Sequence, residues 1–188
     1  MKKSKMLFIA LGLSITLMAG CTTNGAEDPK PEEGKNPPIE GEHDMVHDDS
    51  GEIPAGLKEA EAPTYKVGDN AKILTDHMEG MEGATATVVG AFDTVAYEVS
   101  YNPTNGDPRE ENHKWVIHEE IKEAGAEPLK AGDEVVIEAS HMEGMEGATA
   151  TIESAKETTV YMIDYEPTTG GEKVKNHKWV TDSELSAE

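Results

Sequence analysis

The amino-acid sequence predicts an all-β protein in which two small barrels follow one another after an acidic linker. Two observations carry this prediction. Residues 65–121 align without a gap with residues 129–185 at a constant offset of 64 positions, so the chain contains a tandem repeat. Within each repeat, apolar residues alternate with polar ones, which is the pattern of strands that bury one face.

The first twenty residues have the features of a signal peptide. Three lysines within the first five residues precede an apolar run at 6–19, which is too short for a comfortable membrane span. Small residues then precede Cys21, the only cysteine, in a pattern that resembles the lipobox of bacterial lipoproteins. We therefore predict lipidation at Cys21 and anchoring at the outer face of the bacterial cytoplasmic membrane. An ordinary secretory peptide with an incidental cysteine is the alternative.

Residues 21–63 are predicted to be a lipidated N-terminus followed by a disordered, flexible acidic linker. Prolines are interspersed there with glycines and glutamates, and apolar residues do not recur at a regular spacing. Such a segment cannot bury enough apolar surface to offset the entropy lost when it becomes ordered. Within it, His43, Met45 and His47 lie close enough in sequence for a mobile chain to wrap them around a metal as an accessory site. A solvated acidic tract with chance histidines explains them equally well.

The charge of the chain restricts its partners. Sixteen lysines and arginines against 38 aspartates and glutamates give a formal net charge of −22. Nucleic acids and anionic lipid surfaces are bound through basic patches, so both are excluded as electrostatic partners. The acidity attracts cations without selecting one of them. A single cysteine also excludes an intrachain disulfide.

Each repeat contains the elements of a small barrel. Residues 95–101 alternate Val and Tyr with polar residues, and residues 84–91 are rich in Thr and Val; both patterns return 64 positions later. A Gly-Asp turn, a strand, a Gly-rich loop, two strands, a turn and a Trp-Val strand follow in this order, as is typical of SH3-like or KOW-like barrels. We therefore predict one such barrel at 64–123 and a second at 128–188.

The Gly-rich loop is the strongest functional signal. Residues 77–83, His-Met-Glu-Gly-Met-Glu-Gly, return letter for letter at 141–147. Thioether and imidazole groups suit copper, especially Cu(I), and glycines let a tight loop turn its side chains inward. The alternative is packing, since methionines fill gaps in protein cores and a pair of them could plug a barrel end. The candidate metal ligands are His77, Met78, Met81, His141, Met142 and Met145.

A calcium site is the other metal alternative for these loops. Carboxylates suit calcium, and each loop carries two of them. No EF-hand-like run of alternating Asp and Asn accompanies them, so this alternative ranks below copper. The carboxylates concerned are Glu79, Glu82, Glu143 and Glu146.

A second motif, His-Lys-Trp, occurs at 113–115 and again at 177–179. Alternate residues of a strand point to the same face, so His113 and Trp115 would share one, as would His177 and Trp179. If that face meets the loop, the histidine could complete a copper site and the tryptophan could contact a monovalent cation through its π system. A set of methionine, histidine and tryptophan is similar to that of a periplasmic copper chaperone. In the alternative, the tryptophan belongs to the core and the histidine is a surface residue of the strand.

Taken together, these motifs carry a family resemblance. The lipobox, the duplicated His-Met loop and the duplicated Asn-His-Lys-Trp-Val segment resemble the YdhK family of bacterial lipoproteins over nearly the whole chain. Members include a copper-resistance lipoprotein, which implies copper binding at the cell surface. The resemblance implies the six loop histidines and methionines as ligands, with His113 and His177 as further candidates.

Two functional hypotheses follow. The first is an extracytoplasmic copper-binding lipoprotein that buffers or sequesters Cu(I), stores it or hands it to a copper-exporting transporter, and so contributes to copper resistance. The second is an SH3-like interaction module that binds cell-wall peptide or a protein partner. Catalysis is not expected, because no nucleophile–base pair stands out and the only cysteine serves the anchor.

Overall fold

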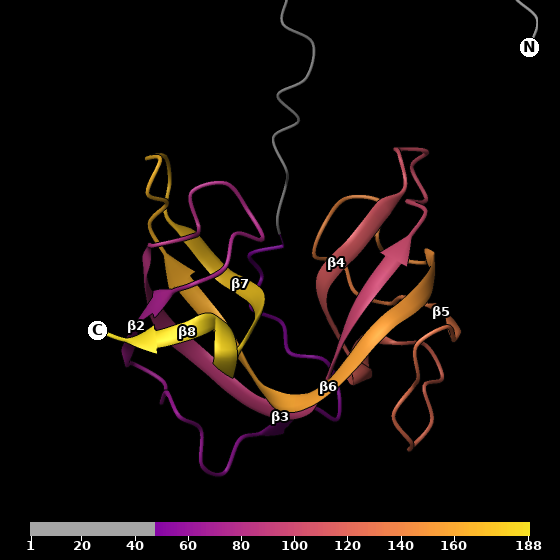
Figure 1. Cartoon of the computed structure of the whole chain (residues 1–188), viewed down its shortest axis with the longest axis horizontal. Helices are drawn as coiled ribbons and strands as arrows, with labels where there is room; N and C mark the ends of the chain where they lie inside the picture. The colour runs from indigo at the N-terminus through magenta and orange to yellow at the C-terminus, as the bar shows by residue number, and fades with distance from the viewer. Residues whose placement is uncertain (1–47) are drawn as a thin grey trace, which may run out of the picture. The chain divides into compact units, whose positions relative to one another are not determined.

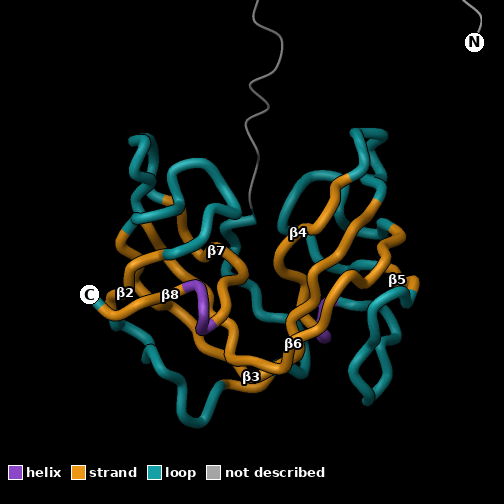
Figure 2. The backbone as a smooth tube through the Cα atoms, in the orientation of Figure 1, coloured by secondary structure: helices purple, strands orange, loops and turns teal. Residues whose placement is uncertain are grey.

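The computed structural model describes residues 48–188. The predicted signal peptide, Cys21 and the candidate ligands His43, Met45 and His47 lie outside the described residues. The described part contains strands and two short 3-10 helices, which confirms the all-β prediction (Figure 2). Within residues 48–188, no helix is long and apolar enough to cross a membrane.

The elements follow the chain as β1 (Lys58–Glu59), β2 (Asn70–Ile73), β3 (Thr85–Tyr101), β4 (Glu110–Ile117), η1 (His118–Glu120), β5 (Glu134–Val136), β6 (Thr149–Tyr165), β7 (Val174–Thr181), η2 (Asp182–Glu184) and β8 (Leu185–Ala187). All pairings between these strands are antiparallel. The two repeats give matching elements, so β2, β3, β4 and η1 correspond to β5, β6, β7 and η2.

Strands β3 and β6 are the long elements of the fold, with 17 residues each, and they pair with each other along their length (Figure 1). The register runs from Ala86 opposite Tyr165 to Tyr101 opposite Ala150. The beginning of each strand therefore lies beside the end of the other. A strand of 17 residues reaches about 55 Å when extended, so its two ends cannot belong to the same small barrel.

Each half of the sheet is consequently built from both repeats. Strand β2 from the first repeat pairs with β8 from the second, and Ile121 at the end of the first repeat bridges to Ile137 of the second. The structure therefore corrects the prediction of one barrel at 64–123 and another at 128–188. The sequence could not decide this point, because duplicated strands carry the same alternation whether they pair within a repeat or between repeats.

The cores confirm the exchange. One core contains Met81 and residues of β2 and early β3, together with Tyr161 and Tyr165 from late β6; we call this the Met81 half. The other contains Met145 and residues of early β6, together with Tyr97 and Tyr101 from late β3; we call it the Met145 half. All four tyrosines are buried, as expected of core aromatics, but each lies with the loop methionine of the other repeat.

A third apolar cluster lies where β3 and β6 cross from one half to the other. Both tryptophans belong to it, so the core alternative for these side chains is confirmed. Its members are Phe92, Ala96, Trp115, Ile117, Val160, Met162 and Trp179.

The predicted linker ends earlier than residue 63. Residues 58–59 form β1 and pair with β3. The Asp48 carboxylate lies 3.0 Å from Lys178 Nζ, and Asn176 Nδ2 donates to the carbonyl of Asp49 over 2.7 Å. An ion pair and a side-chain-to-backbone hydrogen bond thus hold a segment that has too few apolar residues to indicate order in the sequence. We call residues 48–55 the N-terminal strap.

Candidate metal centre

The two His-Met loops adopt matching tight turns. In the first loop, the N–H of Met81 donates to the carbonyl of Met78 over 3.2 Å, and Met145 and Met142 form the same bond in the second. Gly80 and Gly144 have φ values of 75° and 78°, in the left-handed region that favours glycine. This requirement explains why glycine stands between the two methionines of each loop.

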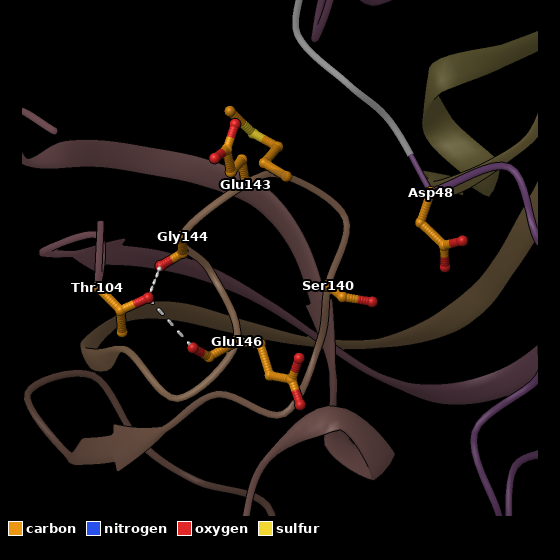
Figure 3. A pocket seen from close by; sticks show the side chains of 7 residues that line it. Asp48, Thr104, Ser140, Glu143, Gly144 and Glu146 are labelled. Atoms are coloured by element: carbon orange, nitrogen blue, oxygen red, sulfur yellow. Dashed lines mark hydrogen bonds between the residues drawn. The ribbon is translucent and has the colours of Figure 1, made fainter. Parts of the chain in front are cut away.

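Each loop is held by a turn from the other repeat. The carbonyl of Gly80 accepts from the N–H of Thr168 over 2.8 Å, and the carbonyl of Gly144 accepts from the N–H of Thr104 over the same distance. The Thr104 hydroxyl also donates to the carbonyls of Gly144 and Glu146, over 3.2 and 3.5 Å (Figure 3). The strand exchange therefore determines the position of both loops.

The two methionines of a loop have different surroundings. Met81 and Met145 are fully buried among aliphatic and aromatic core residues, so packing accounts for them. Met78 is half-buried, and its sulfur accepts a hydrogen bond from the Tyr165 hydroxyl over 3.5 Å. Met142 is half-buried as well and lines a pocket beside Thr104. In each loop the second methionine is therefore fully buried, whereas the first is only partly buried.

The loop carboxylates, which the calcium alternative requires as ligands, are exposed in both copies. They are Glu79, Glu82, Glu143 and Glu146. Among residues 48–188, no group of three or more His, Cys, Asp or Glu side chains is arranged to hold a metal ion.

The loop histidines contact buried carboxylates that none of the sequence motifs indicated. His77 Nε2 lies 2.8 Å from Glu184 Oε1, and His141 Nε2 lies 2.7 Å from Glu120 Oε1. His141 and Glu120 are 5% and 6% exposed, and His77 and Glu184 are 10% and 13% exposed. The two glutamates occupy equivalent positions of the two repeats. Their equivalence was the only feature of the sequence that could have indicated a role for them.

The environment of Glu184 favours its charged form. Burial raises the pKa of this carboxyl group, but the hydrogen bonds and charge of His77 and the bonds from Thr181 and Trp115 outweigh burial and lower the pKa to about 2. An ionised carboxylate only accepts hydrogen bonds, so whenever the His77 ring is neutral its one proton is on Nε2. Its Nδ1 is buried and has no hydrogen-bond partner in the described structure, and the same holds for Nδ1 of His141.

The strand histidines face the loop histidines of the other repeat. The ring centroids of His77 and His177 are 6.4 Å apart, and those of His113 and His141 are also 6.4 Å apart. His113 therefore meets the second loop rather than the loop of its own repeat. His77 and His113 also line one pocket of about 300 Å³, so the two pairs are not isolated from each other.

His113 and Trp115 do not share surroundings, contrary to the strand pattern. The pairing of β3 with β4 skips a residue between the pairs Tyr97–Val116 and Val99–His113, and such a β-bulge redirects the side chains that follow it. As a result, His113 packs edge-on against Tyr101 at 5.9 Å, whereas Trp115 enters the central cluster. Strand β7 has the same irregularity around His177.

The tryptophans connect to the carboxylates. Trp115 Nε1 donates to Glu184 Oε2 over 2.8 Å, and Trp179 Nε1 lies 3.2 Å from both oxygens of Glu120. The ammonium group of Lys114 lies over the ring of Trp115, 5.4 Å from the ring centroid. Trp179 is fully buried and packs edge-on against Phe92. These contacts account for both rings without a bound cation.

The N-terminal strap makes the two halves unequal. It lines a pocket of about 400 Å³ together with His141, Glu120 and Lys178. A hydrogen bond from Ser50 is the largest cause that lowers the pKa of Asp48 to about 2, and Lys178 lowers it further. At the matching position of the first repeat, Lys114 is exposed.

Two copies of a short β unit that exchange strands and each present a His-Met loop define a class of tandem-repeat β proteins. Residues 67–118 and 131–182 match the family described as Protein of unknown function (DUF1541), and the chain belongs to this family. It is 52% identical over 187 residues to the uncharacterized protein YdhK of Bacillus subtilis (strain 168), and the match covers 100% of this chain and 91% of YdhK. The resemblance predicted from the motifs is thus confirmed.

Solved structures of proteins from the same family are similar to the structure of this chain. A crystal structure of a DUF1541 family protein (ydhK) from Bacillus subtilis has a TM-score of 0.72 at 64% identity, covering 73% of this chain and 93% of that one. A second crystal structure of the ydhK protein has a TM-score of 0.63 at 66% identity, covering 64% and 98% of the two chains.

Proposed function

We propose that this protein is a lipid-anchored, extracytoplasmic copper-binding protein that buffers or sequesters Cu(I) and thereby contributes to copper resistance. It would bind the ion as cargo and carry out no reaction on it. Its location follows from the predicted signal peptide and from lipidation at Cys21. The proposal depends on the donors in the two halves.

The observation that carries the proposal is the pairing of a loop histidine with a strand histidine in each half. Two imidazoles that share one ion have ring centroids about 6 Å apart when they lie opposite each other, from metal–nitrogen bonds of about 2 Å and ring radii of about 1 Å. The centroids of His77 and His177 are 6.4 Å apart, and so are those of His113 and His141. Both separations allow a shared ion.

The donor types favour Cu(I). Beside the first pair lies Met78, whose sulfur meets the hydroxyl of Tyr165, and Tyr165 packs edge-on against His177. Two imidazoles and a thioether are soft or borderline donors that suit Cu(I), whereas calcium and magnesium require oxygen donors. We assign His77, Met78 and His177 to one site and His141, Met142 and His113 to the other.

The proposed sites differ from the sequence prediction in two respects. Met81 and Met145 are left out, because full burial in the cores explains them. Each site also combines a loop from one repeat with a strand from the other. The interaction-module alternative is less well supported, because a recognition edge would expose its methionines, whereas one methionine of each loop is buried and the other half-buried.

A titration with Cu(I) in competition with a chromogenic chelator tests the proposal. We expect two strongly bound ions in the mature wild-type protein. In the double variant His77→Ala/His177→Ala both substitutions fall in one site, so one strong ion remains. In His77→Ala/His113→Ala they fall in different sites, so neither site keeps both imidazoles.

The controls separate binding from folding. Glu79→Gln with Glu143→Gln changes exposed carboxylates only and should leave both ions bound. Circular dichroism on each variant checks that the β structure persists. Unchanged competition in a folded protein that lacks both loop histidines would refute the proposed function.

A further inference from the structure

Two buried carboxylates occupy equivalent places in the halves, and nothing in the sequence motifs pointed to them. Glu120 ends η1 and Glu184 ends η2, directly after the strand that carries the tryptophan. Each side chain reaches back to a backbone N–H: Glu120 accepts from Ile117 over 3.1 Å, and Glu184 accepts from Thr181 over 2.8 Å. Each carboxylate is therefore held by its own turn, independently of its bond to the histidine.

The two oxygens of Glu184 have unequal surroundings. Oε2 accepts from Trp115 Nε1 over 2.8 Å, from the backbone N–H of Thr181 and from the Thr181 hydroxyl over 2.9 Å. Among residues 48–188, Oε1 has a single hydrogen-bond partner, His77 Nε2 at 2.8 Å. Three donors therefore fix one oxygen, and the other is presented to the imidazole.

This arrangement determines which nitrogen of His77 carries the proton. A carboxylate cannot donate, so the neutral ring must donate from Nε2, and its lone pair is then on Nδ1. In metal sites, a ligating histidine almost always donates its other ring N–H to a carboxylate, a carbonyl or a water. Nδ1 of His77 is buried without a hydrogen-bond partner in the described structure, which is the state expected of a ligand atom before it binds.

We infer that Glu184 and Glu120 are positioning residues, which hold His77 and His141 in the Nε2–H tautomer and keep Nδ1 as the atom that binds the soft cation. The assignment of the tautomer stands on the hydrogen bonds alone, whereas the role of Nδ1 as a ligand rests on the proposed function. Each carboxylate comes from the repeat opposite to its histidine, so the strand exchange is required for this arrangement as well.

Glu184→Gln is the sharpest variant, because glutamine has the same shape but only one accepting oxygen. Three donors compete for that oxygen at the Oε2 position, so the amide NH2 is turned toward His77 and donates to Nε2. The ring must then carry its proton on Nδ1 and loses the lone pair there. A substitution of amide for carboxylate acts in the same way in serine proteases, where it leaves the geometry intact and selects the wrong tautomer.

Long-range 1H–15N correlation spectra of the metal-free protein report the tautomer of each histidine. In the wild-type protein we expect His77 and His141 with the proton on Nε2. In Glu184→Gln we expect His77 to change to the Nδ1–H form while His141 stays unchanged. Trp115→Phe is the matched control, because it removes one donor from Glu184 Oε2 and leaves the bond to His77, so the tautomer should persist.

Cu(I) titration of the same variants measures the consequence for binding. Loss of such a supporting carboxylate weakens metal affinity about 10- to 100-fold. We expect that loss at one of the two sites in Glu184→Gln, with the second site unchanged, and wild-type binding in Trp115→Phe. Because a merely structural role of Glu184 would affect the melting temperature but not the tautomer, the two roles are separable.

Two results would overturn the inference. One is a wild-type spectrum in which His77 carries its proton on Nδ1. The other is a folded Glu184→Gln variant in which His77 keeps its tautomer and both ions bind as in the wild type. If the tautomers follow the expectation and the wild-type protein binds no copper, the proposed function fails while the positioning of the imidazoles stands.

Discussion

Replacement of Met81 tests whether this side chain serves packing or binding. Its side chain is 0% exposed and lies in the core with Ile73, Ala84 and Tyr161. Met81→Ala removes three buried heavy atoms and leaves a cavity, and changes of this kind cost 2–5 kcal/mol, so we expect the free energy of unfolding to fall by about 3 kcal/mol. Met81→Leu nearly conserves volume and should cost less than about 1.5 kcal/mol.

Thermal unfolding followed by circular dichroism measures both effects. For a chain of this size, 1 kcal/mol corresponds to a change in Tm of about 2–4 °C, so Met81→Ala should lower Tm by about 6–12 °C. Met81→Leu should remain within about 6 °C of the wild type and bind the same number of copper ions. Met78→Leu should change Tm little, because Met78 is only half-buried, and should weaken one copper site.

The comparison between the two leucine variants decides the question. If Met81→Leu loses a copper ion at unchanged Tm, the side chain is a ligand and the reasoning from burial is refuted. If Met81→Ala is as stable as the wild type, the side chain is not part of the core. Met145 offers the same test in the other half and should give the same result.

Three further predictions follow from the structure. Asp48→Asn should lower the free energy of unfolding by about 1–2 kcal/mol, because it removes the charge partner of Lys178, whose side chain is only 6% exposed. The same variant should speed proteolysis of residues 48–55, and Glu79→Gln is the control. Burial, and next the hydrogen bond to Asp182, raise the pKa of Tyr161 to about 12. The contribution of Tyr161 to stability is therefore fully present below a pH of about 10 and is lost as the pH rises through 12. Absorbance at 295 nm, compared with Tm over the same pH range, checks this, and ionisation of Tyr161 near pH 10 would contradict it. A chain of residues 122–188 alone should form a dimer, because each core needs strands from two repeats, and a folded monomer in light scattering would contradict the exchange.

The strands and the repeats were predictable because they depend on local pattern. The alternation of residues 95–101 and of 159–165 predicts strands, and the structure has them within β3 and β6. The prediction of a single buried face was wrong, because Ala96, Val160 and Met162 on the opposite face are buried in the third cluster. The glycines of the His-Met loops predict tight turns, and in the structure Gly80 and Gly144 have the positive φ values of such turns. The types of the candidate ligands are equally local, because the chemical identity of a side chain does not depend on its position in the fold.

The division of the loop methionines and the separation of His113 from Trp115 were not predictable in this way. Met78 and Met81 are the same residue three positions apart, and only the packing of late β6 against the loop decides that one is buried completely. The bulge in β4 shifts His113 and Trp115 into different surroundings. A bulge changes the side-chain period at one residue, so an alternating pattern does not reveal it.

The sequence by itself determined that this protein is a duplicated all-β chain with two His-Met loops, because alternation, glycine turns and donor types are properties of neighbouring residues. Only the tertiary structure decided that strands are exchanged between the repeats. Two nearly identical repeats offer the same hydrogen bonds and apolar faces within a copy and between copies, so the choice between them depends on the continuity of β3 and β6 through both halves. That choice places His77 beside His177 and Glu184, and it is the reason why the candidate sites belong to neither repeat alone.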